Sequence, residues 1–120
     1  MKTYKDLEIY QEGYKLALEM YKITRTFPKE ETYEMVSQLR RASTSIAMNI
    51  AEGYGRMSNS EMGRFTKMAI GGCNEIKVTL EMSKDLEYLK ETTYQELIER
   101  YEVLGKRLYK FLQSLNQVKD

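Results

Sequence analysis

Apolar residues recur every three or four positions along most of the chain, which is the period of an amphipathic α-helix. The first predicted helix, residues 7–27, carries two such stripes side by side. The first stripe contains Leu7, Tyr10, Tyr14, Ala17, Tyr21 and Thr24, and the second contains Ile9, Gly13, Leu16, Met20, Ile23 and Phe27. Together they form one wide apolar face. We expect this helix to end at Phe27, because Pro28 disfavours helical geometry in the residue before it.

Three further helices are predicted from the same period, over residues 32–54, 59–89 and 93–117. Short turns between long helices favour antiparallel neighbours. No segment shows the alternation of apolar and polar residues that is typical of a strand. The sequence therefore predicts one all-α domain over residues 1–120, an antiparallel up-down-up-down four-helix bundle.

Residues that begin helices, and an internal glycine pair, refine this prediction. The candidate N-caps are Thr32 for the second helix, Ser58 or Asn59 for the third, and Thr92 or Thr93 for the fourth. The pair Gly71-Gly72 lies in the middle of the third helix, where it lowers helix stability by about 2 kcal/mol relative to two alanines. We expect such a pair where the backbone of another helix comes close.

Composition limits the chemistry that this chain can perform. The 120 residues are 42% hydrophobic and 31% charged, which is enough for one core without disulfides or metals. There is no His, so the commonest general base and metal ligand is missing. We therefore predict a protein that is not an enzyme, with no catalytic residues and no cofactor. The 19 basic and 18 acidic residues give a net charge of +1, which lacks the simplest signature of a nucleic-acid binder.

The N-terminal residues and the single cysteine indicate a compartment. The first residues carry charge but no apolar core of a secretory signal, and no apolar run approaches the ~18 residues that span a bilayer. Cys73 has no second cysteine with which to form an internal disulfide. We therefore expect a cytoplasmic protein without a membrane partner.

Two carboxylates and the cysteine are the remaining candidates for chemistry. Glu52 and Glu75 fall on helices that should face each other, and a carboxylate metal site is one interpretation. The favoured alternative is that each is paired with an arginine or held by hydrogen bonds. Cys73 lacks a histidine partner and stands in an apolar register beside Gly72, which favours a packed thiol over a nucleophile.

A line of polar residues follows one side of the second helix. Ser45, Asn49 and Glu52 are spaced i, i+4 and i+7, next to an apolar stripe. Such residues inside a bundle need hydrogen-bond partners. One interpretation is a recognition patch or polar cleft. The favoured one is an internal hydrogen-bond network that fixes the register of the helices.

A basic set lies on the second and third helices. It consists of Arg40, Arg41, Arg56, Arg64 and Lys67. These side chains are candidate contacts for the phosphates of a nucleic acid. The favoured alternative is that they are solvated charges paired with Glu34, Glu52 and Glu61.

Several segments resemble the 23S rRNA intervening-sequence proteins, also called bacterial four-helix bundle proteins. The segments are Asp6–Gln11, Phe27–Tyr33, Gln38–Ala42, Ser45-Ile46, Asn49–Gly53, Gly55-Arg56 and Arg64-Phe65, with Ala69, Gly71 and Glu75. The resemblance extends over residues 4–115. Two features depart from it. Gly71-Gly72 stands where relatives often have Gly-Ser, and the strongly basic character of the family's retroelement-associated branch is missing.

The resemblance implies more than the residue patterns do. It implies an antiparallel four-helix bundle that assembles as a ring-shaped homopentamer and has no established enzymatic activity. A related branch, the accessory proteins of diversity-generating retroelements, binds nucleic acid and a reverse transcriptase. Ser45, Asn49, Glu52 and Glu75 would be motif residues, and the arginines of the basic set would be phosphate contacts.

Two functions follow from these observations. The favoured one is a non-enzymatic, self-assembling scaffold or interaction protein, because the apolar face of residues 7–27 is wider than a four-helix core normally buries. The alternative is an oligomer that binds RNA or DNA. A ring would multiply a modest basic patch by its symmetry, so a chain of near-zero net charge can still present a positive surface.

Overall fold

The computed structural model describes residues 2–116, and this part of the chain is helical throughout, with no strand. The four long helices are α1 (Glu8–Thr24), α2 (Ser37–Gly55), α3 (Asn59–Asp85) and α4 (Glu91–Leu115). Single 3₁₀ turns, Tyr4–Asp6 and Lys29–Glu31, precede α1 and follow it, and a π-helical segment, Thr32–Val36, leads into α2. The all-α prediction is confirmed.

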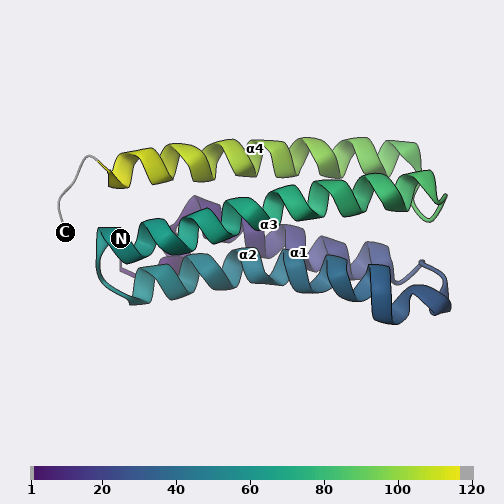
Figure 1. Cartoon of the computed structure of the whole chain (residues 1–120), viewed down its shortest axis with the longest axis horizontal. Coiled ribbons are helices and arrows are strands. Elements are labelled where there is room, and N and C mark those ends of the chain that lie inside the picture. The colour runs from purple at the N-terminus through teal and green to yellow at the C-terminus, as the bar shows by residue number, and fades with distance from the viewer. Residues whose placement is uncertain (1, 117–120) are drawn as a thin grey trace.

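Consecutive helices run in opposite directions along the long axis of the molecule (Figure 1). Contacts between helix ends agree with this picture. The Arg40 side chain, near the start of α2, hydrogen-bonds to Tyr21 and Thr24 near the end of α1. Lys84, near the end of α3, lies 3.9 Å from Glu91 at the start of α4. The arrangement is compatible with the helical bundle that the sequence predicts.

The helix ends differ from prediction where side chains compete for backbone groups. Helix α1 ends at Thr24 instead of Phe27. The Arg40 guanidinium takes the carbonyl oxygen of Tyr21, an acceptor that the next helical turn would have used. Phe27 then turns into the core, where its ring lies 5.7 Å from the ring of Tyr88.

Of the predicted N-caps, Ser58 is confirmed, since its hydroxyl oxygen accepts a hydrogen bond from the backbone N–H of Glu61 at 3.1 Å. Thr32 is not a cap, because it lies within the π-helical segment. Thr92 and Thr93 are not caps either. The N–H of Tyr94 bonds to the carbonyl of Lys90, so α4 begins two residues earlier than predicted. Residue 117, the predicted end of this helix, lies outside the described residues.

Helices α1, α2 and α3 meet closely around Ile46, which is fully buried. Two glycines leave the space for its side chain. A Cβ atom added at Gly13 would lie 3.2 Å from Cγ2 of Ile46, and one added at Gly72 would lie 3.1 Å from Cγ1. The predicted close approach is therefore confirmed at Gly72. Gly71 instead faces open space, because the helical turn points it away from α2.

No helix within residues 2–116 is long and apolar enough to cross a membrane. The exposed apolar side chains lie on helices that also carry many charged residues. The core is correspondingly confined to one face of each helix.

The hydroxyl of Tyr101, on α4, is buried in the core and has no hydrogen-bond partner in the described structure. Burial raises the pKa of this phenol well above its usual value, so it stays neutral. We expect Tyr101→Phe to increase the free energy of unfolding by about 1 kcal/mol, because it removes an unsatisfied polar group and keeps the ring. Denaturant unfolding measures this change.

Tyr88→Phe is the matched control for this prediction. The Tyr88 hydroxyl donates a hydrogen bond to Glu31 at 2.8 Å, so its removal should lower stability instead. A loss of stability in Tyr101→Phe would contradict the prediction and indicate that a buried water satisfies the hydroxyl.

Candidate functional site

Arg40, from the predicted basic set, is engaged by α1. Its Nε donates a hydrogen bond to the Thr24 hydroxyl at 2.9 Å, and its Nη2 donates to the Tyr21 carbonyl at 3.2 Å. The guanidinium carbon also lies 4.6 Å from the centre of the Tyr21 ring. Arg40 therefore holds the end of α1 against α2.

Three other arginines of the set lie beside carboxylates. Arg41 donates to Glu75 at 2.9 Å, across α2 and α3. Arg64 makes two hydrogen bonds to Glu61, at 3.0 and 3.1 Å, which lower the pKa of that carboxyl and raise the pKa of the guanidinium. Arg56 lies between Glu52 at 3.3 Å and Glu61 at 3.5 Å. These positive charges are largely neutralised at the surface.

Glu34, also expected as a partner, takes no part in an ion pair within the described chain. Lys67 is exposed and forms no ion pair within the described chain.

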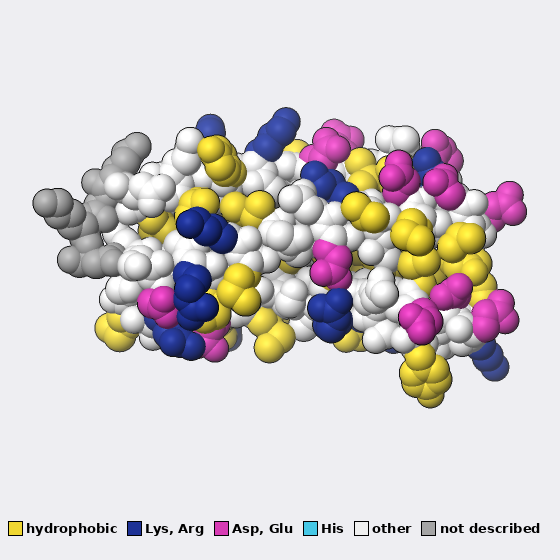
Figure 2. Space-filling view, in the orientation of Figure 1, with side chains coloured by type: hydrophobic (Ala, Val, Ile, Leu, Met, Phe, Trp, Pro, Cys, Tyr) yellow, Lys and Arg dark blue, Asp and Glu magenta, His cyan; other side chains and the backbone are white. Residues whose placement is uncertain are grey.

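Charge is unevenly distributed on the face of the molecule in Figure 2. Lys and Arg gather over the half nearer to the labelled chain ends, and Asp and Glu gather over the other half. The net charge of +1 does not reveal this separation on the face shown.

The polar residues of the predicted network are not joined by hydrogen bonds among the described side chains. The Ser45 hydroxyl donates to the carbonyl of Ala42 in its own helix. Glu52 is paired with Arg56, and Glu75 is paired with Arg41. Asn49 is half-buried, and its side chain makes no hydrogen bond within residues 2–116. Ser45 and Glu52 interact with nearby residues of the chain, whereas Glu75 pairs with another helix, and the four residues do not form one site.

The two carboxylates considered for a metal lie far apart. Glu75 contacts Arg41, eleven residues before Glu52 on α2, which corresponds to about 16 Å of helix. In the part of the chain that the structure describes, no three His, Cys, Asp or Glu side chains are placed to hold a metal ion. Both carboxylates are instead paired with arginine, as the favoured sequence interpretation expects.

Cys73 is buried between α3 and α4. Burial raises the pKa of its thiol to about 12, with a smaller opposite effect from the charge of Lys77. The thiol is therefore neutral at physiological pH and a poor nucleophile. It behaves as a small apolar side chain.

An uncharged groove of about 420 Å³ runs between α1 and α2. We call it the tyrosine groove. Its large side chains are Tyr4, Tyr10, Tyr14, Leu18, Tyr21 and Met48, and alanines and Thr44 complete the lining. Leu18 is 51% exposed and Met48 is 64% exposed. Tyr14 and Tyr21, from the first of the two stripes on α1, are 49% and 42% exposed, so this stripe supplies side chains that the bundle leaves open to solvent.

A second apolar surface lies on the outside of α3. We call it the α3 stripe, and it consists of Val78 and Met82 of α3 and of Leu86, which directly follows the helix, spaced four residues apart. All three are about half exposed. Figure 2 shows hydrophobic side chains gathered at the end of the molecule where α3 turns into α4, with carboxylates around them. The stripe was not predicted from the sequence, although its three residues recur every four positions there.

The described chain is a helical bundle with two exposed apolar faces, and its fold defines a small all-α protein of the helical-bundle class. The chain belongs to the 23S rRNA-intervening sequence protein family, whose model matches residues 5–110. The family resemblance drawn from the sequence is confirmed.

A solved structure shares the fold. It is a protein of unknown function from the S23 ribosomal protein family of Bacteroides thetaiotaomicron VPI-5482, with a TM-score of 0.81 and 21% sequence identity. The match covers 88% of this chain and 95% of that one. Among curated proteins, none matches the chain.

Proposed function

We propose that this protein is a non-enzymatic scaffold that assembles with copies of itself in the cytoplasm. The observation that carries this proposal is the pair of exposed apolar faces, the tyrosine groove and the α3 stripe. Contiguous apolar surface that the fold itself does not bury is typical of an interface.

The two faces fit a ring. In a closed ring of more than two copies, each subunit offers two different surfaces, and one surface of each copy meets the other surface of the next. The tyrosine groove lies between α1 and α2, whereas the α3 stripe lies on another helix. We propose that the α3 stripe of one copy packs into the tyrosine groove of its neighbour.

The chemistry of the tyrosine groove supports this role. Tyrosine combines a large apolar ring with a polar tip, and it is enriched at protein interfaces. The rings of Tyr4 and Tyr10 pack edge to face at 4.9 Å, and those of Tyr10 and Tyr14 stack at 6.0 Å. This packing orders the groove before a partner arrives, which reduces the entropy lost on association.

Light scattering on the purified protein tests the proposal. At micromolar concentration we expect a mass that is a multiple of the 14.2 kDa chain. A homopentamer, the ring that the resemblance to the family implies, would have a mass of about 71 kDa, five times 14.2 kDa. A mass of one chain at this concentration would contradict self-assembly.

The non-enzymatic part of the proposal is supported by the state of the candidate groups. The Cys73 thiol has a raised pKa, and Glu52 and Glu75 are exposed and paired with arginine.

The alternative function, binding of RNA or DNA through the predicted basic set, has less support. Four of its five side chains are already engaged by protein groups.

A further inference from the structure

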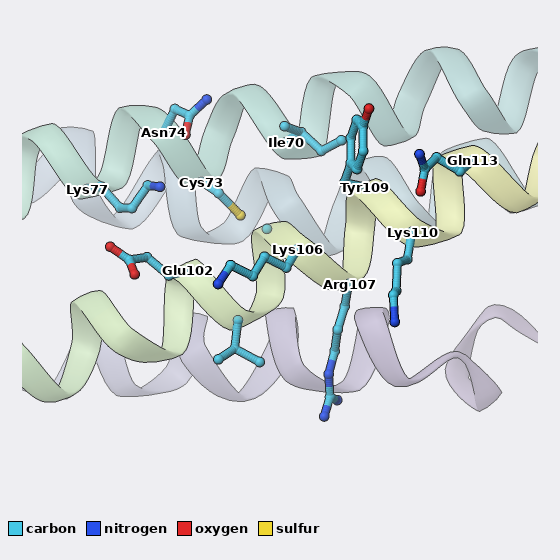
Figure 3. Close-up of a pocket in the computed structure, with 12 residues that line it drawn as sticks. Ile70, Cys73, Asn74, Lys77, Glu102, Lys106, Arg107, Tyr109, Lys110 and Gln113 are labelled. Carbon is cyan, nitrogen blue, oxygen red and sulfur yellow. The ribbon is translucent and has the colours of Figure 1, made fainter.

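A groove of about 720 Å³ between α3 and α4 is used by neither of the proposed interfaces. We call it the basic groove. Ile70, Cys73 and Lys77 line it from α3, and Lys106, Tyr109 and Lys110 line it from α4. In Figure 3 the ring of Tyr109 stands beside Ile70, and the Cys73 thiol points toward α4 between the two helices.

The floor of the basic groove is apolar and neutral. Burial keeps the Cys73 thiol uncharged, with a pKa raised to about 12. Ile70 is half-buried, and the Tyr109 ring is 56% exposed. An occupant gains by covering this floor with apolar side chains of its own.

The sides of the basic groove carry positive charge that the protein leaves unpaired. Lys77, Lys106 and Lys110 form no ion pair within residues 2–116. They differ in this respect from the arginines of the predicted basic set. Arg107 also lines the groove, but it lies 3.7 Å from Glu8 of α1. One carboxylate, Glu102, faces the groove near Lys77 (Figure 3).

We infer that the basic groove binds an amphipathic α-helix of a partner protein, with an apolar stripe flanked by Asp or Glu side chains. Lys106 and Lys110 are one helical turn apart, about 6 Å, so carboxylates four residues apart on a helix match them. The α4 side of the groove runs from Glu102 to Gln113, about 16 Å, which is three turns of a bound helix. Helix-in-groove recognition uses this combination of an apolar floor and charged sides.

A nucleic-acid strand matches the basic groove less well. Its phosphates would reach Lys106 and Lys110, but they would also approach the Glu102 carboxylate. Its sugars and phosphates would cover Ile70 without gaining from an apolar floor. The charges and the floor together therefore favour an acidic amphipathic helix.

Fluorescence anisotropy with designed peptides tests this inference on the assembled protein. The probe is a labelled peptide of about 14 residues, or four turns, with Leu at i, i+3, i+4 and i+7 and Glu on both flanks. We expect it to bind at least about tenfold more tightly than the same peptide with Lys in place of Glu. Lys106→Glu with Lys110→Glu should weaken binding of the acidic peptide at least about tenfold.

Two further variants serve as controls. Lys22→Glu with Lys29→Glu makes the same charge change at exposed positions away from the basic groove, and it should change binding less than about twofold. Tyr109→Leu keeps an apolar floor and removes the aromatic ring, so peptide binding should persist. A single-stranded RNA that stacks on this ring would lose affinity in the same variant.

The outcomes separate the possible occupants. Equal binding of both peptides, or none, would overturn the inference. The inference would also be overturned if the single-stranded RNA bound more tightly than the acidic peptide and lost this binding in Lys106→Glu with Lys110→Glu. That result would assign the groove to nucleic acid. If that double variant changes the mass of the assembly, the groove is an interface between copies instead of a peptide site. The test does not depend on self-assembly, because the peptide also has access to the groove in a single chain.

Discussion

Two variants that are each monomeric are expected to form a heterodimer of about 28 kDa when mixed, twice the 14.2 kDa of one chain. The first variant carries Leu18→Glu and Met48→Glu in the tyrosine groove. The second carries Val78→Glu and Met82→Glu on the α3 stripe. Each has one damaged face and one intact face, so the mixture restores a single interface between the two chains.

Each variant is expected to be monomeric because self-association would bury the added carboxylates. All four side chains are at least half exposed in the single chain, so the added carboxylates are solvated there and the bundle still folds. In an assembly they would be buried without a partner, at a cost of several kcal/mol each. Since each 1.4 kcal/mol is tenfold in affinity, we expect association to weaken by more than about 100-fold.

Light scattering on each variant and on the equimolar mixture measures the result. The control is Tyr33→Glu with Val103→Glu, which adds the same charge at exposed apolar positions outside both faces and should leave the mass unchanged. Any other set of masses for the two variants and their mixture would contradict a ring in which the groove of one copy meets the α3 stripe of the next. If the groove packed against its own copy in a symmetric dimer, the α3 variant would remain dimeric and mixing would change nothing.

The second large effect is expected in the core, where Ile46→Ala should lower the free energy of unfolding by about 2–5 kcal/mol. Ile46 is fully buried between the backbones of Gly13 and Gly72, on α1 and α3. The glycines have no side chains that could move into the cavity, so the space left by the substitution should not collapse. The expected loss is a large part of the free energy of unfolding of a typical domain, which is about 5–15 kcal/mol.

Urea unfolding at a fixed protein concentration measures this change, because self-assembly would make stability depend on concentration. Ile46→Val provides a graded comparison, with an expected loss of about 0.5–1.5 kcal/mol. Similar stability of Ile46→Ala and the unchanged protein would contradict the close contact of the three helices.

Helix type and approximate extent could be predicted from the sequence because they depend on local periodicity. The two stripes on α1, and the cap at Ser58, require only residues that are neighbours along the chain. The true end of α1 depends on a side chain nineteen positions away, since Arg40 donates to the carbonyl of Tyr21. Helix ends therefore failed where tertiary hydrogen bonds competed with local ones.

The candidate site could be predicted only in part. The sequence indicated that arginines of the basic set would pair with Glu34, Glu52 and Glu61, and the structure pairs Arg56 with Glu52 and Arg64 with Glu61. It did not reveal that Arg41 pairs with Glu75, because that contact joins two helices. It also grouped Ser45, Asn49 and Glu52 by their spacing, although in the structure each interacts with a different neighbour or with none in the described chain.

By itself, the sequence determined the helical class, the family and the surplus of apolar residues on α1, since these follow from residue type and spacing. Only the tertiary structure decided which apolar residues remain exposed and which charges remain unpaired. The physical reason is that burial and charge neutralisation depend on side chains from neighbouring helices. The sequence places Glu102 four residues before Lys106, the same spacing that pairs Arg56 with Glu52, yet Lys106 forms no ion pair within residues 2–116.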